Sequence, residues 1–213
     1  MPRLMERVGY DFPFADPASG LTPFGEPGEY DGSVRANWKV LMENGSECYH
    51  CPTVHPESVG ATLHTELEFQ LNTRGKFGVV AGLPLKKEWR ARFPGGKRGS
   101  QYGFALYAVW PNSFIISGYF GEFILRYEPT GPNTVRFLSR GYGRPDLPVE
   151  PLHELLGILA ATNAEDIEIA ERVQHGLDSG YYDPGPVLTE PEAIVHAYCS
   201  SAPSSWKLWA LFP

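Results

Sequence analysis

The fold is decided by residues 151–180, which read PLHELLGILAATNAEDIEIAERVQHGLDSG. This stretch predicts a long helix, because apolar side chains recur at steps of three and four residues and so share one stripe. The stripe comprises Leu152, Leu155, Leu159, Asn163, Asp166, Ala170, Val173 and Leu177. Charged side chains fall away from it and are expected to be solvated, namely Glu165, Glu168, Glu171 and Arg172.

The sequence upstream of this helix predicts an antiparallel sheet. Six short segments are rich in aromatic and β-branched residues and are separated by Gly, Pro and Asn; they are residues 66–72, 76–82, 101–110, 113–120, 122–129 and 133–142. Several follow one another too closely for crossover helices, so the strands form a meander. We therefore predict an α+β domain in which a curved antiparallel sheet packs on the long C-terminal helix.

Two further segments complete the predicted organisation. Residues 37–50 carry helix formers, and Pro52 disfavours helical backbone at Cys51, so a helix is expected to end there. Residues 1–36 are rich in Pro and Gly and are expected to form an extended arm on a single domain of residues 37–213. A Gly-, Pro- and Arg-rich loop is expected at residues 90–99.

Composition excludes several classes of protein. The chain has 213 residues, a net charge of −7 and no run of Lys or Arg, which argues against binding to nucleic acid. Its three cysteines are too few for a disulfide scaffold. No apolar run approaches the length needed to cross a bilayer, and no secretion signal is recognisable, so the expected location is cytoplasmic, without a membrane partner.

Asp166 stands near the centre of the apolar stripe. An ionised carboxylate that faces a core costs several kcal/mol unless something compensates it. A cationic side chain, a hydrogen-bond network or a bound metal could do so. On the evidence of the helix alone, a structural ion pair or a partly solvated helix face is favoured over a metal as the explanation for Asp166.

A second group of polar residues surrounds a break in the chain. His50 and His55 are five residues apart, about 140° of rotation on a straight helix, but a break at Pro52 allows His55 to fold back. Asn44, Glu47 and His50 follow one another at intervals of three residues and project to neighbouring positions. Together with Asp166, the two histidines make a possible two-His-one-carboxylate triad, which suits non-haem Fe(II) and leaves positions open for dioxygen and substrate.

Other metal sites fit this segment less well. The spacing of the histidines does not match the His-Glu-x-x-His signature of zinc proteases. The pair Cys48-x-x-Cys51 has no second pair to complete a zinc finger, and Cys48-Tyr49-His50 lacks the partner motif of a Rieske cluster. Two histidines satisfied at a tight turn, with both cysteines as small core residues, remain the alternative to a metal site.

The motifs as a whole resemble a known family. They are Asn37-Trp38-Lys39, Glu43-Asn44, Glu47-Cys48-Tyr49-His50-Cys51-Pro52-x-x-His55-Pro56, Glu165-Asp166-Ile167, Glu171-Arg172-Val173-Gln174-x-Gly176-Leu177-x-Ser179 and Tyr182-x-Pro184-Gly185. In this order they resemble the catalytic domain of Rieske non-haem iron oxygenases over about residues 33–200. That family includes ring-hydroxylating dioxygenases and monooxygenases of the choline, carnitine and glycine-betaine type.

The resemblance implies roles for five residues. His50, His55 and Asp166 would hold the mononuclear Fe(II), Glu47 would be the carboxylate that links the iron to the Rieske cluster of a neighbouring subunit, and Asn44 would lie close to the metal. It also implies a helix-grip fold and a homotrimer or hetero-oligomer. Family members usually carry an N-terminal Rieske domain, so the two-iron two-sulfur cluster is expected on a partner chain or an absent domain.

The expected activity is that of an oxygenase. It would use electrons from a Rieske or reductase donor to hydroxylate or demethylate a small aromatic or quaternary-amine substrate. The alternatives are a non-catalytic module that binds hydrophobic ligands, with a vestigial metal site, and a hydrolytic metalloenzyme. Candidate pocket residues lie between the sheet and the helix, although ordinary core packing is the favoured explanation for most of them; they are Phe104, Tyr107, Val109, Phe114, Ile116, Tyr119 and Phe123.

Overall fold

A computed structural model describes most of the chain. The described residues are 20–26, 28–63, 77–83, 85–92, 104–109, 111–118, 120–183, 185–187, 192 and 195–196, with only the backbone at 77–83, 104 and 105. The strand predicted at residues 66–72 and most of the loop predicted at 90–99 lie outside them.

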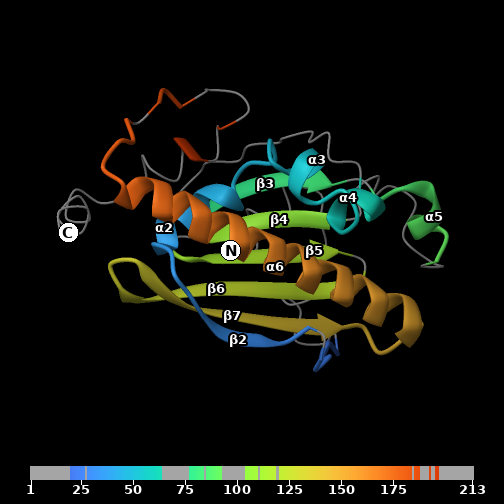
Figure 1. Cartoon of the computed structure of the whole chain (residues 1–213). Helices are drawn as coiled ribbons and strands as arrows, with labels where there is room; N and C mark the ends of the chain where they lie inside the picture. The colour runs from blue at the N-terminus through green and yellow to red at the C-terminus, as the bar shows by residue number, and fades with distance from the viewer. Residues whose placement is uncertain are drawn as a thin grey trace.

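An antiparallel sheet forms one layer of the molecule. Within the described residues it contains β1 (Thr22–Pro23), β2 (Tyr30–Val34), β3 (Phe77–Leu83), β4 (Phe104–Val109), β5 (Ser113–Gly118), β6 (Gly121–Gly131) and β7 (Thr134–Gly143). The order is β1-β7-β6-β5-β4-β3, and β2 also pairs with β7. Strands β3 to β7 therefore lie side by side in chain order, which confirms the predicted meander (Figure 1).

The first two strands extend this sheet at the β7 edge. Thr22 pairs with Gly143, and Tyr30 pairs with Ser139 further along β7. The described part of the segment expected to be an arm thus runs along the sheet through backbone hydrogen bonds.

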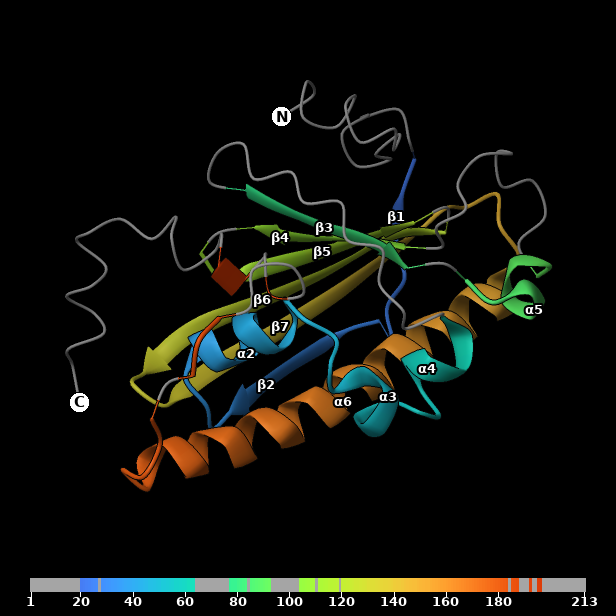
Figure 2. The ribbon, with the colours of Figure 1, turned by 90° about the horizontal axis from the view of Figure 1, so that it is seen from above.

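The helices lie on one side of the sheet, as Figure 2 shows. They are α2 (Trp38–Asn44), α3 (Cys51–Val54), α4 (Val59–Thr62), α5 (Lys87–Arg90) and α6 (Val149–Asp178). Helix α6 runs across the sheet, so the predicted α+β architecture of a sheet gripping a long C-terminal helix is confirmed (Figure 1). No helix in the described ranges is both long and apolar enough to cross a membrane.

The N-terminal half of α6 forms the core with the sheet. Leu152, Leu155 and Leu159 are buried as predicted, and Phe123 and Phe137 of the sheet belong to the same cluster. The predicted stripe is wrong at its C-terminal end, where Val173 is 45% exposed and Gln174 is buried instead. Polar contacts decide this, because the Gln174 side chain accepts a hydrogen bond from the Asn37 amide and donates one to Asp178.

The helix predicted over residues 37–50 is shorter than expected. It ends at Asn44, and the ring of Phe114 packs where a Cβ atom on Gly45 would lie, 2.7 Å away. Pro52 does not end a helix; it stands in the first turn of α3, where the missing N–H of proline removes no helical hydrogen bond. His50 consequently begins α3 instead of ending α2.

Candidate metal centre

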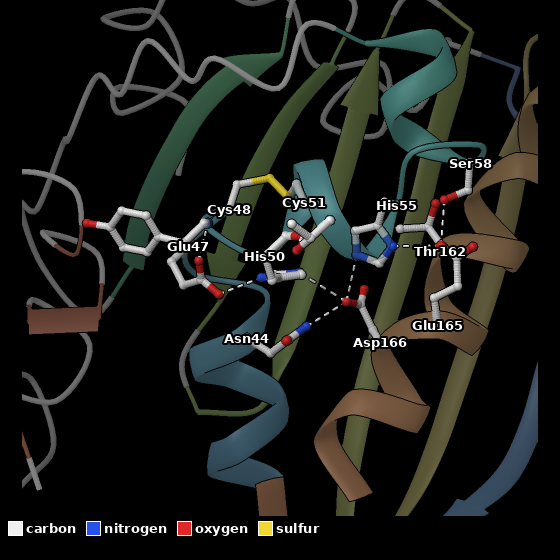
Figure 3. Close-up of polar contacts among 12 residues, drawn as sticks. Asn44, Glu47, Cys48, His50, Cys51, His55, Ser58, Thr162, Glu165 and Asp166 are labelled. Carbon is white, nitrogen blue, oxygen red and sulfur yellow. Dashed lines mark hydrogen bonds and ion pairs between the residues drawn. A yellow bond between two sulfur atoms is a disulfide. The ribbon is translucent and has the colours of Figure 1, made fainter. Parts of the chain in front are cut away.

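Two side chains from the ends of α3 meet one side chain of α6. Asp166 Oδ1 lies 3.3 Å from His50 Nε2 and 3.0 Å from His55 Nε2. The two imidazole rings stand nearly perpendicular, with centroids 5.1 Å apart. Figure 3 shows both rings turned toward the carboxylate. The structure thus brings together the three residues that the resemblance assigns to the metal.

Local structure explains how the histidines reach this point. His50 and His55 stand at the two ends of α3, and the His55 amide donates to the Cys51 carbonyl at 3.0 Å. One short helical turn therefore separates them and sets both rings on the side that faces α6 (Figure 3). His55 is only 1% exposed, so its ring has little freedom to leave this position.

A hydrogen-bond network surrounds the carboxylate of Asp166. Asn44 Nδ2 donates to Asp166 Oδ1 at 2.7 Å, and the two histidines contact the same oxygen atom. These polar contacts provide one of the three compensations considered from the sequence. Among the described residues that line the adjoining cavity there is no Lys or Arg.

Each histidine also contacts a carboxylate through its other ring nitrogen. His50 Nδ1 lies 2.6 Å from Glu47 Oε1, and His55 Nδ1 lies 2.6 Å from Glu165 Oε2. The sequence-based expectation that Glu165 is merely solvated is therefore wrong. Helical periodicity gives only the direction in which a side chain leaves the helix. The Glu165 side chain is long enough to reach His55 from a position outside the apolar stripe.

These contacts perturb the protonation of the cluster. Burial opposes a charge on His50, but hydrogen bonds to Asp166 and Glu47 outweigh it and raise the pKa of His50 to about 9. The pKa of His55 is also raised against the effect of burial, chiefly by its hydrogen bond to Asp166. Burial alone would raise the pKa of Asp166, whereas the hydrogen bonds from both histidines lower it.

The donor atoms suit a shared cation. If each imidazole is neutral and donates its Nδ1 proton to a glutamate, each Nε2 presents a lone pair to an oxygen of Asp166. Two acceptors repel each other unless a proton or a cation lies between them. Metal bonds of about 2.1 Å at right angles would separate neighbouring donor atoms by about 3 Å, close to the observed separations. Two imidazoles and one carboxylate are also a donor set that fits Fe(II).

A largely apolar cavity of about 110 Å³ adjoins these donor atoms. Phe114 and Ile116 line it, as predicted, together with Leu106, Leu125 and Tyr127, which the sequence-based list omitted. The full lining comprises Leu41, Asn44, Gly45, Glu47, Cys48, His50, Cys51, His55, Val59, Leu63, Leu106, Phe114, Ile116, Leu125, Tyr127, Leu159, Thr162, Asn163 and Asp166.

Three of the candidate lining residues do not line the cavity, as expected for core packing. Tyr107 and Val109 do not line the cavity, because strand alternation turns them away from the face that carries Leu106. Phe123 shares a face with the lining residue Leu125, but it lies two residues earlier in β6 and belongs to the hydrophobic core. The Phe104 side chain and Tyr119 are outside the described residues.

Cys48 and Cys51 are joined by a disulfide, which the sequence did not predict. Their spacing in one turn brings the two Cα atoms to 5.0 Å. The Cys51 sulfur lies near the ring nitrogens of His50 and His55, but it is bonded to Cys48. The carboxylate of Asp166, not a thiolate, is therefore the third donor group that faces both rings.

Comparison with known sequences identifies the same kind of domain. Residues 9–202 match the family model described as "Ring hydroxylating alpha subunit (catalytic domain)". The oxygenase subunit of glycine betaine monooxygenase from Chromohalobacter salexigens is 25% identical, over 71% of this chain and 43% of that protein. The oxygenase subunit of carnitine monooxygenase from Escherichia coli is 26% identical, over 73% of this chain and 41% of that protein. The chain thus spans less than half the length of these curated relatives.

Solved structures share the fold. A quaternary ammonium Rieske monooxygenase in complex with L-carnitine superposes with a TM-score of 0.67 at 19% identity, covering 94% of this chain and 53% of that one. Naphthalene 1,2-dioxygenase from Rhodococcus sp. gives a TM-score of 0.56 at 17% identity, with coverage of 86% and 56%. At these identities the likeness concerns the architecture of the domain.

Proposed function

The chain belongs to the family of ring-hydroxylating alpha subunits, whose catalytic domain it matches, and on that premise we propose that it is the catalytic part of a non-haem Fe(II) oxygenase. His50, His55 and Asp166 would hold the iron. The observation that carries the proposal is that Asp166 Oδ1 lies 3.3 Å from His50 Nε2 and 3.0 Å from His55 Nε2, at the wall of an apolar cavity.

The chain's own residues would prepare the reaction. Fe(II) held by these three residues would supply the chemistry that activates dioxygen. Asn44 holds one oxygen of Asp166 by its hydrogen bond, and Glu47 holds the outer nitrogen of His50. The apolar walls formed by Leu106, Ile116 and neighbouring side chains would exclude water and place a substrate beside the metal without a charged contact.

Electrons would come from a Rieske cluster on another domain or chain. Glu47 is the residue proposed to face that donor, because it contacts His50 on the side away from Asp166. Tyr49 close to it is one of the exposed large side chains, and we propose that a neighbouring subunit contacts the site on this side. The assembly proposed is a homotrimer or a hetero-oligomer with the donor.

A small quaternary amine is the substrate class we propose, in preference to an aromatic compound. The relatives named for glycine betaine and carnitine support this choice. The cavity beside the proposed ligands has a volume of about 110 Å³, and its described lining residues include no Lys or Arg. Its methyl-rich walls and the rings of Phe114 and Tyr127, 6.2 Å apart, would suit the methyl groups and positive charge of a trimethylammonium head.

Oxygen consumption tests the proposal. The chain is loaded anaerobically with Fe(II), mixed with a Rieske-type donor and its reductase, and offered glycine betaine, carnitine, choline or benzoate. We expect one of the quaternary amines to stimulate oxygen uptake and product formation, and an Asp166→Ala variant to lose both. Stimulation by benzoate alone would contradict the substrate class.

The same assay separates the other two candidates. Ligand binding that is indifferent to chelators, without oxygen uptake, would indicate a non-catalytic binding module. Turnover supported by zinc without any reductant would indicate a hydrolase. Either result would overturn the proposed oxygenase.

A further inference from the structure

Two residues outside the proposed ligand set act on His55. Glu165 Oε2 lies 2.6 Å from His55 Nδ1 and accepts a hydrogen bond of 2.6 Å from Ser58 Oγ (Figure 3). Ser58 is buried in the turn between α3 and α4, and Glu165 belongs to α6. Glu165 of the long helix therefore bridges Ser58 and His55 through one carboxylate oxygen.

Consecutive residues of α6 contact both nitrogens of the His55 ring. Glu165 contacts Nδ1, and Asp166 lies 3.0 Å from Nε2. An imidazole can bind a metal through Nε2 only when that atom carries no proton, so the ring proton must stand on Nδ1. A carboxylate that accepts a hydrogen bond from Nδ1–H favours this tautomer and fixes the plane of the ring.

Ser58 gives Glu165 a fixed orientation. The Glu165 side chain is 34% exposed, and a partly exposed carboxylate would otherwise exchange among several rotamers. The Ser58 hydroxyl is buried and donates to the same oxygen atom that faces His55. Removal of this hydroxyl would free the carboxylate to turn toward solvent.

The other histidine is held in a different way. Glu47 contacts His50 from only three residues away, and its second oxygen accepts a hydrogen bond from the Tyr49 amide. That contact stays within one turn of the chain. The contact of Glu165 with His55 instead spans 110 residues and joins the segment carrying both histidines to the helix carrying Asp166.

We propose that Glu165, oriented by Ser58, is a positioning residue that fixes His55 in its metal-binding tautomer and so sets the metal affinity of the site. This inference rests on the proposed function, because it takes His55 to be a ligand. Neither residue would touch the substrate or the metal. Their effect would pass through the His55 ring alone.

Cobalt binding tests this role directly. Co(II) is titrated into the metal-free protein, and both its visible absorption spectrum and its dissociation constant are recorded. We expect Glu165→Ala to weaken binding about 10- to 100-fold, the usual cost of losing such an outer partner. Glu165→Gln should weaken binding less, because its amide oxygen can still accept the Nδ1 proton, and Ser58→Ala should fall between wild type and Glu165→Ala.

Glu168→Gln serves as the matched control. Glu168 lies on the same helix, and its side chain forms an exposed ion pair with Arg172. Its replacement should change neither the cobalt spectrum nor the affinity. The melting temperature of each metal-free variant shows whether the fold is intact, and Glu165→Gln and Ser58→Ala keep the test usable if Glu165→Ala does not fold.

The outcomes distinguish this inference from the proposed function. If wild type binds one Co(II) and the Glu165 and Ser58 variants bind it with unchanged affinity and spectrum, the positioning role is wrong and the metal site stands. If wild type binds no Co(II), the proposed function is itself overturned. A graded loss of affinity with an altered spectrum in the variants, and no change in Glu168→Gln, supports the inference.

Discussion

At the scale of single residues, the site depends on neutral partners as well as on charges. The uncharged side chain of Asn44, at the end of α2, donates a hydrogen bond of 2.7 Å to Asp166 Oδ1. A hydrogen bond to a charged group contributes more than one between neutral groups. Asn44 therefore helps to keep the carboxylate ionised and directed toward the histidines.

Replacement of Asn44 tests this contribution. Asn44→Ala should lower the free energy of unfolding of the metal-free protein by about 1.5 to 3 kcal/mol, as expected for a lost hydrogen bond to a carboxylate. Urea denaturation measures the change. Asn133→Ala is the control, because its bond to Asp178 is exposed, and a loss within about 0.5 kcal/mol is expected there. Equal losses in both variants would contradict the role assigned to Asn44.

The raised pKa of His50 predicts a dependence of stability on pH. The folded-state pKa is about 9 and the ordinary value is 6.5, so folding favours the protonated imidazole. The stabilisation is complete below pH 6.5 and is lost as pH rises through about 9. The melting temperature of the chelator-treated protein should fall in this window by an amount on the order of 5 °C.

The control for this prediction removes the titrating group. His50→Gln should show a smaller fall in melting temperature over the same pH range, because only His55 and groups elsewhere still titrate. An identical slope in wild type and variant would show that His50 does not carry the effect.

Sequence reasoning found some of these residues and missed others for a physical reason. His50, His55 and Asp166 could be named because a paired histidine motif and a carboxylate on an apolar stripe are visible in the residue order. The contact of Glu165 with His55 was not predicted, because helical periodicity gives the direction of the Cα–Cβ bond but not how far a long side chain reaches. One available signal was Ser58, a small hydroxyl residue just after His55, but nothing local in the sequence pairs it with Glu165.

At the scale of elements, α6 both builds the core and carries Asp166. Its first half is buried against the sheet through leucines, and its second half bears the polar contacts. Arg35 and Asn37, which precede α2, hydrogen-bond to Glu171 and Gln174 of α6. These contacts fix the distance between α2, which carries Asn44, and the turn of α6 that carries Asp166.

A core substitution measures how much α6 contributes to the fold. Leu155 is 0% exposed, so Leu155→Ala should lower the free energy of unfolding by about 2 to 5 kcal/mol. Val173→Ala on the same helix should cost within about 0.5 kcal/mol, because its side chain is 45% exposed. Denaturant titration compares the two variants, and a cost at Val173 as large as that at Leu155 would contradict the assigned face.

The elements themselves were largely predictable. Regular apolar periodicity gave α6, and closely spaced aromatic segments gave β3 to β7. The sequence alone does not show that α2 ends before Gly45, where the ring of Phe114, distant in sequence, packs closely. From the sequence, Pro52 is expected to end a helix, whereas it lies in the first turn of a new helix, α3.

At the scale of the whole molecule, the proposed metal centre exists only through the tertiary fold. Asp166 and the two histidines are more than 110 residues apart in sequence, and α6 joins them by crossing the sheet beside α3 (Figure 2). The chain spans less than half the length of the curated relatives it matches, so the electron donor and the assembly stay proposals. The metal centre can be tested on this chain alone.

Metal stoichiometry is the most direct test of the central claim. Anaerobic titration with Fe(II), followed by desalting and metal analysis, should give about one iron per chain for the wild type. His55→Ala and Asp166→Ala should retain little iron while keeping the circular dichroism spectrum of the fold. A wild type that retains no iron, or an Asp166→Ala variant that retains as much as the wild type, would contradict the account.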